Sequence, residues 1–130
     1  MGGTDQAKSQ TSKLIAIIDD DESICDSLQD LMESAGLLAR CFGSAEEFLQ
    51  YDLRCEFGCL IAEIQMPVMS GLELQARLKE EQWDIPIIFI ASKGGAKMRI
   101  QAMREGAVEF LATPLDYQLL LETVRAALDM

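Results

Sequence analysis

Short apolar runs alternate with longer amphipathic stretches along most of the chain. Each run holds four to six residues and is mostly apolar, as expected for a strand buried on both faces of a parallel sheet. Each longer stretch repeats apolar residues every three or four positions, which is typical of a helix that packs one face on a core. The pattern predicts five strand–helix pairs, at 14–18 and 23–35, 37–42 and 45–51, 59–62 and 72–81, 85–90 and 97–105, and 107–111 and 117–128.

Five such pairs predict an α/β fold with one sheet. We expect a five-stranded parallel sheet, doubly wound in the flavodoxin-like manner, with strand order 2-1-3-4-5 and five helices. In such sheets, ligands bind outside the carboxyl ends of the strands, at the point where the strand order reverses. The ends of the strands are therefore the place to look for a functional site.

Local signals at the ends of the expected helices agree with these boundaries. Ser44 with Glu47, and Ser70 with Glu73, have the spacing of capping boxes at helix starts. Gly36 falls where the end of a helix favours a residue in the left-handed conformation.

The first 13 residues differ from the rest of the chain in composition. They are rich in Gly, Ser, Thr and Gln and show no apolar period, so we expect a disordered leader at 1–13. The chain has 130 residues, which is within the usual size of one domain. Residues 14–130 are therefore expected to form a single domain.

Charge and hydropathy limit the classes of partner. The formal net charge of −11 disfavours direct binding to nucleic acid phosphates or to an anionic membrane, because like charges repel. No apolar stretch approaches the roughly 20 residues needed to cross a bilayer. We expect a soluble protein located in the cytoplasm, since no signal peptide is recognisable.

The chain contains four cysteines and no histidine. Cys25, Cys41, Cys55 and Cys59 lack the C-x2-C spacing of a zinc site, and we expect reduced thiols that serve in core packing. Without histidine the commonest general base is missing, so any chemistry depends on carboxylates and hydroxyls.

Acidic residues follow two strands that the predicted order makes neighbours. Asp19, Asp20 and Asp21 follow the first strand, and Glu63 follows the third. Adjacent strands lie about 4.8 Å apart, so Asp19, Asp20 and Glu63 could share one site. Clustered carboxylates repel unless a cation joins them, and Mg²⁺ is the natural candidate for oxygen ligands. We expect Asp21 to act instead as the N-cap of the following helix.

These features, taken in order, resemble the response-regulator receiver domains of two-component signalling, especially receivers joined to helix-turn-helix outputs. The resemblance rests on "IIDDDESICDSLQDLMESAG", "FGSAEEFL", "MPVMSGLEL", "AMREGAVEFL" and the "TP" that follows. It implies a signalling domain rather than an enzyme. Its partners would be a sensor histidine kinase or other signalling protein, a C-terminal output domain outside this chain and, in a homodimer, a second copy of the chain. It also implies that Asp19, Asp20, the acceptor position and the backbone carbonyl of Gln65 hold Mg²⁺.

The sequence departs from the family pattern at three positions. Glu63 occupies the place of the phosphoacceptor aspartate, Ala91 that of the switch hydroxyl residue, and Thr113 that of the lysine. Ala91 cannot donate a hydrogen bond to a phosphoryl oxygen, and Thr113 cannot supply a cation. Glu63 moves the carboxylate outward by one methylene, so we expect impaired phosphorylation and weak Mg²⁺ binding. Glu63 could mark a phosphorylation site that is no longer needed and has drifted in sequence, or it could imitate a phosphoryl group. The sequence leaves both open.

The family resemblance also indicates a contact surface. Receivers of this type signal through a face drawn here from residues 97–105, 108–111 and 116–128. Three leucines follow one another at 119–121, and a helix cannot bury all three on one face, so Leu119, with Arg125, is the expected contact point. The alternative is that Leu119 is only a singly exposed apolar residue, which is ordinary.

A second interpretation is a magnesium-dependent phosphatase or phosphotransferase of the haloacid dehalogenase type. Asp19, Asp21 and Ser23 follow an apolar strand and fit its D-x-D-x-[ST] pattern. That class also needs a lysine and an acidic pair at later strand ends, where this chain has Ala91 and Thr113. The receiver interpretation is therefore preferred.

Overall fold

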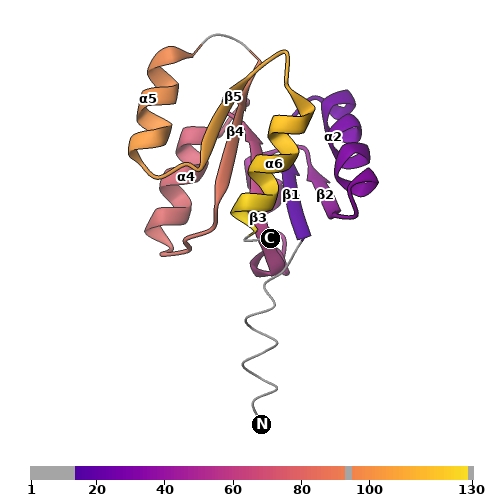
Figure 1. Cartoon of the computed structure of the whole chain (residues 1–130). Coiled ribbons are helices and arrows are strands. Elements are labelled where there is room, and N and C mark those ends of the chain that lie inside the picture. The colour runs from indigo at the N-terminus through magenta and orange to yellow at the C-terminus, as the bar shows by residue number, and fades with distance from the viewer. Residues whose placement is uncertain (1–13, 93–94, 129–130) are drawn as a thin grey trace.

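The computed structural model describes residues 14–92 and 95–128, so the predicted leader at 1–13 lies outside the described residues. A five-stranded parallel sheet with strand order β2-β1-β3-β4-β5 forms the centre of the fold (Figure 1). The predicted fold class and strand order are confirmed, and the ends of the predicted elements are displaced by at most two residues. Within the described ranges the elements are β1 (Leu14–Ile18), α2 (Glu22–Ser34), β2 (Leu38–Phe42), α3 (Ala45–Leu49), the short 3₁₀ helix η1 (Arg54–Glu56), β3 (Phe57–Glu63), α4 (Gly71–Glu80), β4 (Ile87–Ala91), α5 (Ala96–Arg104), β5 (Glu109–Ala112) and α6 (Tyr117–Ala127).

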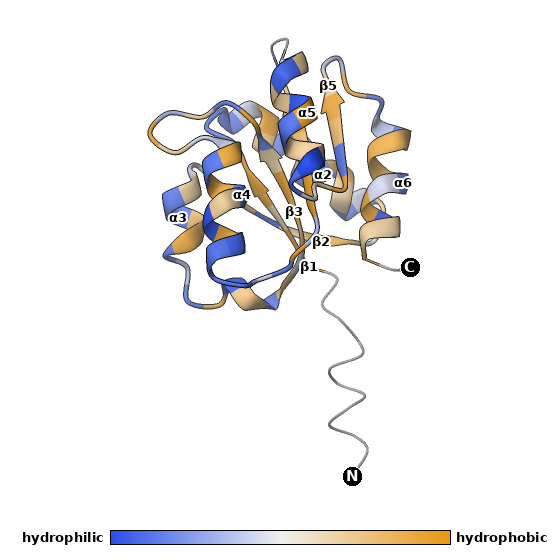
Figure 2. Cartoon of the chain, turned by 90° about the vertical axis from the view of Figure 1, so that its left-hand side faces the viewer, coloured by the Kyte–Doolittle hydropathy of each residue, from blue (hydrophilic) through white to orange (hydrophobic). Residues whose placement is uncertain are grey.

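Helices cover both faces of the sheet. The residues of β1 alternate between two cores: Ala16 and Ile18 pack with α3, α4 and α5, whereas Ile15 and Ile17 pack with α2 and α6. Figure 2 shows the same division, with apolar strands inside and polar outer faces on the helices. Alternate burial on two faces explains why the central strands are apolar at nearly every position.

The exposure of the edge strand β2 differs from the sequence prediction. The sequence pattern predicts that every strand is buried on both faces, and β4 is indeed buried along its whole length. In β2, however, Leu38 is 67% exposed and Arg40 is also exposed. The strand pairs only with β1, so its outer positions face solvent. An apolar run in the sequence therefore does not distinguish a central strand from an edge strand.

The helix caps are confirmed at α4 and only in part at α3. Ser70 accepts the N–H of Glu73 and Glu73 accepts the N–H of Ser70, which is a complete capping box. Ser44 accepts the N–H of Glu47 at 3.1 Å, but the Glu47 carboxylate accepts the N–H of Gly43 rather than that of Ser44. The prediction of a capping box at α3 is therefore wrong for the second hydrogen bond, from the N–H of Ser44 to the Glu47 carboxylate. Gly36 has a φ of 81°, as expected at the end of α2.

Gly71 is required by close packing beneath the carboxyl end of β3. A Cβ atom at position 71 would lie 2.9 Å from the Glu63 carbonyl oxygen, the Ile64 Cα and the Phe89 ring. The N–H of Gly71 also donates to the Ile64 carbonyl at 2.8 Å. The start of α4 is thus held directly against the backbone that carries Glu63.

We predict that Gly71→Ala destabilises the domain by about 1–3 kcal/mol, because an added methyl group in a packed site forces backbone shifts. Gly43→Ala is the matched control, since its Cβ would meet only a Glu47 oxygen at 3.8 Å. The control should change stability by less than about 0.5 kcal/mol. Urea unfolding followed by the fluorescence of Trp83, which stacks on Phe48, measures both. Equal stability of the two variants would contradict the close approach at Gly71.

Candidate functional site

The carboxyl ends of the parallel strands bring the predicted acidic residues together. Ile18 pairs with Ala62 across β1 and β3, so the residues that follow, Asp19 and Glu63, lie at the same edge of the sheet. A pocket of about 330 Å³ opens there. Its lining includes Asp19, Asp20, Glu63, Gln65 and Ser92. The structure therefore places all four predicted metal-site residues around one pocket.

Asp19 is a buried carboxylate with one oxygen unused. Only 3% of the residue is exposed. Its Oδ1 accepts the N–H of Asp21 at 2.8 Å, whereas its Oδ2 has no hydrogen-bond partner. Burial raises the pKa of Asp19 to about 6, and the negative charges of Glu63 and Asp20 act in the same direction. Oδ2 is therefore the atom in this pocket at which a bound proton or cation would most stabilise the structure.

Glu63 is equally buried, but both of its oxygens are engaged. Oε1 accepts the Ser92 hydroxyl at 3.0 Å, and Oε2 accepts the backbone N–H of Gln65 at 3.2 Å. The residue is 3% exposed. These two bonds hold the carboxylate in one orientation at the end of β3.

Ser92 is a site residue that the sequence pattern wrongly excludes. Alternation of side chains along a strand suggests that the residue after Ala91 points away from the pocket. β4 ends at Ala91, however, and Ser92 lies beyond it, where the alternation no longer applies. The only signal in the sequence is a hydroxyl residue directly after a strand that neighbours the acidic site.

Ala91 and Thr113 do not reach the pocket. Ala91 is buried at the end of β4, and Thr113 is exposed beyond β5. The Thr113 hydroxyl donates to the Ser92 carbonyl at 3.4 Å, so it contacts the backbone next to the pocket. Asp21 caps α2, as expected, by accepting the N–H of Ser23 at 2.9 Å.

The side chains fit a magnesium ion only in part. Asp19 Oδ2 is a free buried acceptor, and the exposed Asp20 lines the same pocket. Both Glu63 oxygens already accept hydrogen bonds. Across residues 14–92 and 95–128, no group of three or more Cys, Asp or Glu side chains is arranged to hold a metal ion. Mg²⁺ binding by Asp19, Asp20, Glu63 and the Gln65 carbonyl stays a prediction.

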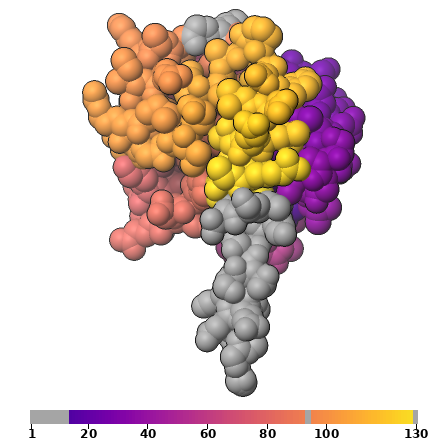
Figure 3. All heavy atoms as spheres, viewed as in Figure 1, coloured from indigo at the N-terminus to yellow at the C-terminus, as the bar shows by residue number. Residues whose placement is uncertain are grey.

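The predicted contact residues lie on α6, which with α5 and β5 forms one face of the molecule (Figure 3). Leu119 is 43% exposed, whereas Leu120 and Val124 are buried. Arg125 donates from Nη2 to the Ala35 carbonyl at 3.3 Å, which ties α6 to the end of α2. Leu119 is therefore available to a partner, and Arg125 is partly engaged within the domain. No helix in the part of the chain that the structure describes is long and apolar enough to cross a membrane.

Comparison with known proteins gives a consistent result. The family model described as "Response regulator receiver domain" matches residues 15–125. The response regulator protein TodT of Pseudomonas putida is 43% identical over 122 residues, which is 94% of this chain and 54% of TodT. The transcriptional regulatory protein TdiR of Thauera aromatica is 40% identical over 121 residues, covering 93% of this chain and 53% of TdiR. The chain thus spans about half the length of the curated relatives it matches.

Solved structures agree. The crystal structure of FixJ-N has a TM-score of 0.83 at 32% identity, covering 89% of this chain and 93% of that one. The response regulator StyR has a TM-score of 0.83 at 38% identity, covering 89% of this chain and 59% of StyR. These comparisons give no support to the haloacid dehalogenase alternative.

We predict that Asp19 lowers the free energy of unfolding more strongly as the pH rises. A carboxyl with a pKa near 6 in the folded state and 3.8 in the unfolded state ionises first in the unfolded chain. Wild type should therefore lose stability relative to Asp19→Asn as the pH rises from 4 to 7, by about 2–3 kcal/mol in total. Urea unfolding at both pH values in EDTA measures the difference. Asp20→Asn controls for the loss of a negative charge from the pocket, and a pH-independent difference for Asp19→Asn would contradict the prediction.

Proposed function

Since the chain belongs to the response regulator receiver domain family, we propose that it is a receiver whose signalling state is set by the Glu63 carboxylate rather than by phosphorylation. The observation that carries this proposal is the pair of hydrogen bonds from Ser92 and Gln65 to a buried Glu63. Such a domain transmits its state through protein contacts and does not need a phosphodonor.

Phosphoryl transfer to Glu63 is disfavoured by its surroundings. An acceptor carboxylate needs one oxygen placed in line with the incoming phosphorus and the other on the metal ion. In this pocket both oxygens accept hydrogen bonds from the protein itself. These bonds fix the orientation of the carboxylate and compete with the in-line placement that attack requires. The added methylene also displaces the nucleophile from the end of the strand.

Imitation of a phosphoryl group explains the site better than decay. A phosphoryl group on a shorter aspartate would lie about where a longer carboxylate ends, and it would take hydrogen bonds from a hydroxyl and from backbone N–H groups. Glu63 takes one bond of each kind, from Ser92 and Gln65. A buried charge without partners is costly. Two donors directed at Glu63 therefore favour a carboxylate that imitates a phosphoryl group over a residue left behind by a site that has lost its function.

Among the residues that the structure describes, no lysine or arginine lines the pocket. Thr113 stands at the lysine position and donates to the Ser92 carbonyl, so it supports the residue that holds Glu63. Burial is the main cause of the raised pKa of Asp19, and repulsion by the negative charge of Glu63 adds to it. A proton on Asp19, or a weakly bound Mg²⁺ on its Oδ2, would relieve this repulsion.

The lengths and names of the relatives suggest which kind of output domain this receiver controls. They are about twice as long as the part matched here and are named response regulators or transcriptional regulatory proteins. The proposal is that this chain is the receiver part of such a regulator and controls a DNA-binding output domain outside this chain. A sensor histidine kinase or another signalling protein would be its partner, and the face of α5, β5 and α6 would carry the contact.

We predict that wild type is not labelled by a small acyl phosphate with magnesium, and that Glu63→Asp alone gives at most a trace. The transferred group would still lack the hydroxyl at position 91 and the lysine at position 113. Charge-assisted contacts to phosphoryl oxygens are worth about 1.5–3 kcal/mol each. Loss of the lysine alone therefore lowers the occupancy of the phosphorylated form roughly ten- to a hundredfold. The triple variant Glu63→Asp, Ala91→Thr, Thr113→Lys should accept the label. Intact mass after incubation measures all three proteins.

Each result of the labelling experiment has a definite meaning. Ready labelling of wild type would show that Glu63 is a working acceptor and would overturn the proposal. A triple variant that folds, as judged by circular dichroism, and still resists labelling would place the defect elsewhere in the pocket.

We predict that Leu119→Glu weakens self-association or partner binding by at least tenfold, because a charge would be buried in an apolar contact. Leu53→Glu is the matched control, since Leu53 is 49% exposed and lies before β3, away from α6. Sedimentation velocity across a range of protein concentrations measures self-association. Identical behaviour of wild type and both variants would remove α6 as the association surface.

A further inference from the structure

A groove lies between α3 and α4 on the face of the sheet opposite α2 and α6. Both helices pack on the core that contains Ala16 and Ile18, and they lie side by side in Figure 2. A pocket of about 320 Å³ opens between them. Its lining comes from Glu46 of α3, from Val68 and Met69 in the loop before α4, and from one face of α4, and we call it the α3–α4 groove.

Val68 in this groove is both exposed and strained. It is 89% exposed, the largest fraction among the large apolar residues that the structure describes. Its φ of 69° lies in the left-handed region, which a β-branched residue rarely adopts. An asparagine would hold the same backbone with less strain. The valine therefore lowers the stability of the domain without being buried in it, as expected where strain serves a function.

The exposed apolar surface continues from Val68 onto α4. Met69 is half-buried and packs on the core beneath the groove. Ala76 is exposed on the face of α4 that lines the groove, and its small side chain leaves room for another helix to approach. The groove therefore offers a strip of apolar surface to a partner.

Carboxylates border this apolar strip. Glu46 of α3 and Glu80 of α4 line the groove and make no ion pair among the described residues. Glu73 is the third acidic residue of the lining, and its Oε1 accepts the N–H of Ser70 at the start of α4. Within the described part of the chain, Glu46 and Glu80 thus remain available to cations from outside.

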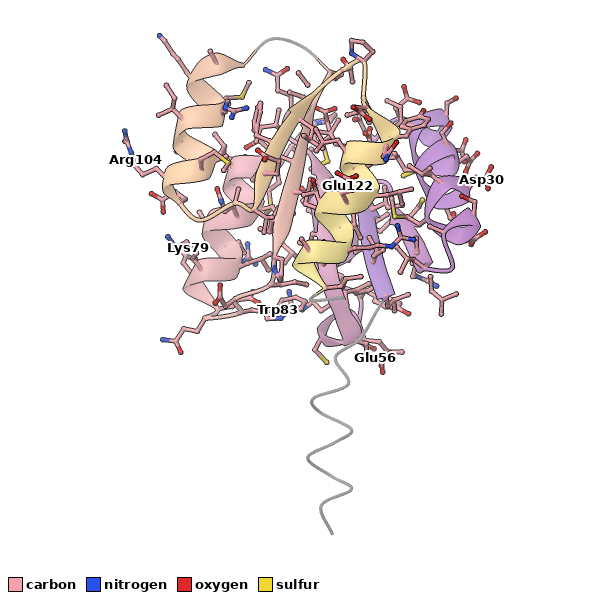
Figure 4. The ribbon with its side chains drawn as sticks, viewed as in Figure 1. Asp30, Glu56, Lys79, Trp83, Arg104 and Glu122 are labelled. Atoms are coloured by element: carbon pink, nitrogen blue, oxygen red, sulfur yellow. The ribbon has the colours of Figure 1, made fainter. Side chains whose placement is uncertain are left out.

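The basic side chains of α4 are already paired. Arg77 also lines the groove, but its Nε lies 3.6 Å from the Glu81 carboxylate. Lys79 turns toward α5 and pairs with Glu105 at 2.6 Å (Figure 4). Among the described residues, neither cation pairs with a carboxylate of the groove. A partner of the groove should therefore carry positive charge beside its apolar side chains.

We propose that the α3–α4 groove binds a basic amphipathic helix of a partner protein. The apolar face of that helix covers Val68, Met69 and Ala76, and its lysines or arginines pair with Glu46 and Glu80. Burial of the Val68 side chain in the complex supplies the apolar contact that the free domain lacks.

Two other occupants fit the groove less well. A second copy of the chain would bring its own negative charge, since the net charge is −11. The segment 1–13 carries two lysines, but it has apolar residues only at Met1 and Ala7 and so offers no apolar face. A separate basic helix meets both requirements.

The groove goes beyond the proposed function and stands without it. Among the described residues, it has no lining residue in common with the pocket at Glu63 and Ser92. Binding of a helix therefore tests the groove alone, and labelling by a phosphodonor tests Glu63 alone.

The test is a titration of the ¹⁵N-labelled full chain with a synthetic peptide of leucine and lysine, about four turns long so that a helix can form. Its leucines recur at i, i+3, i+4 and i+7 and form one face. Amide signals of residues 68–80 should shift most, and binding should weaken several-fold at high ionic strength. The same peptide with glutamate for each lysine, or scrambled so that no apolar face forms, should bind more weakly by about tenfold or more.

Val68→Asn separates binding from folding. It should weaken peptide binding by about tenfold or more, because it removes an apolar side chain from the contact. It should also melt at the same or a higher temperature than wild type, since asparagine tolerates the left-handed conformation. Val68→Ile should keep the wild-type affinity. Leu38→Asn is the matched control, because Leu38 is 67% exposed on β2, outside the groove, and this variant should bind as wild type does.

The charge of the groove has its own test. Glu46→Gln combined with Glu80→Gln should weaken binding several-fold at low ionic strength and little at high ionic strength. Asp30→Asn combined with Glu33→Gln removes two exposed charges from α2 instead, and its affinity should stay within about twofold of wild type.

Other results would contradict a docking groove for a basic helix. Equal affinity for the amphipathic and the scrambled peptide, or shifts centred on α2 or α6, would mean that net charge alone attracts the peptide. Wild-type affinity of Val68→Asn would remove Val68 from the contact. Concentration-dependent shifts at residues 68–80 without peptide would assign the groove to a second copy. Signals of residues 1–13 that move in Val68→Asn would assign it to the start of the chain.

Discussion

The parallel pairing of all five strands is the constraint on which the site depends. It places every strand's carboxyl end at one edge of the sheet, so Asp19 and Glu63 are neighbours although 44 positions separate them in the sequence. The same pairing buries the central strands on both faces, which requires helices on each side. Gly71 then sets α4 against the backbone at Glu63. Sheet order, helix placement and pocket are therefore consequences of one topology.

Charge balance at that edge sets the chemistry. Two buried carboxylates lie at one pocket, and no lysine or arginine of the described part of the chain lines it. Glu63 is stabilised by donors from Ser92 and Gln65, whereas Asp19 keeps an unpaired oxygen and has a raised pKa. Glu63 is therefore the carboxylate whose orientation the protein fixes. Asp19 is the carboxylate with an oxygen free for a proton or a cation.

Much of the fold and part of the site could be predicted from the sequence. Apolar runs and helical periods identified the elements, and the parallel-sheet rule brought Asp19 and Glu63 together. The exposure of Leu38 was missed, because an apolar run does not reveal which strand lies at an edge. The part of Ser92 in the site was missed because the direction of its side chain depends on the turn beyond β4.

Amide NMR spectra can show whether the bond between Ser92 and Glu63 holds the domain in one state. We expect Glu63→Gln and Ser92→Ala to shift a common set of amides that extends through β4 into α5. We also expect an acyl phosphate with Mg²⁺ to leave the wild-type spectrum unchanged. Shifts confined to the immediate neighbours of each substitution, or a wild-type spectrum that responds to the phosphodonor, would contradict this role of the bond.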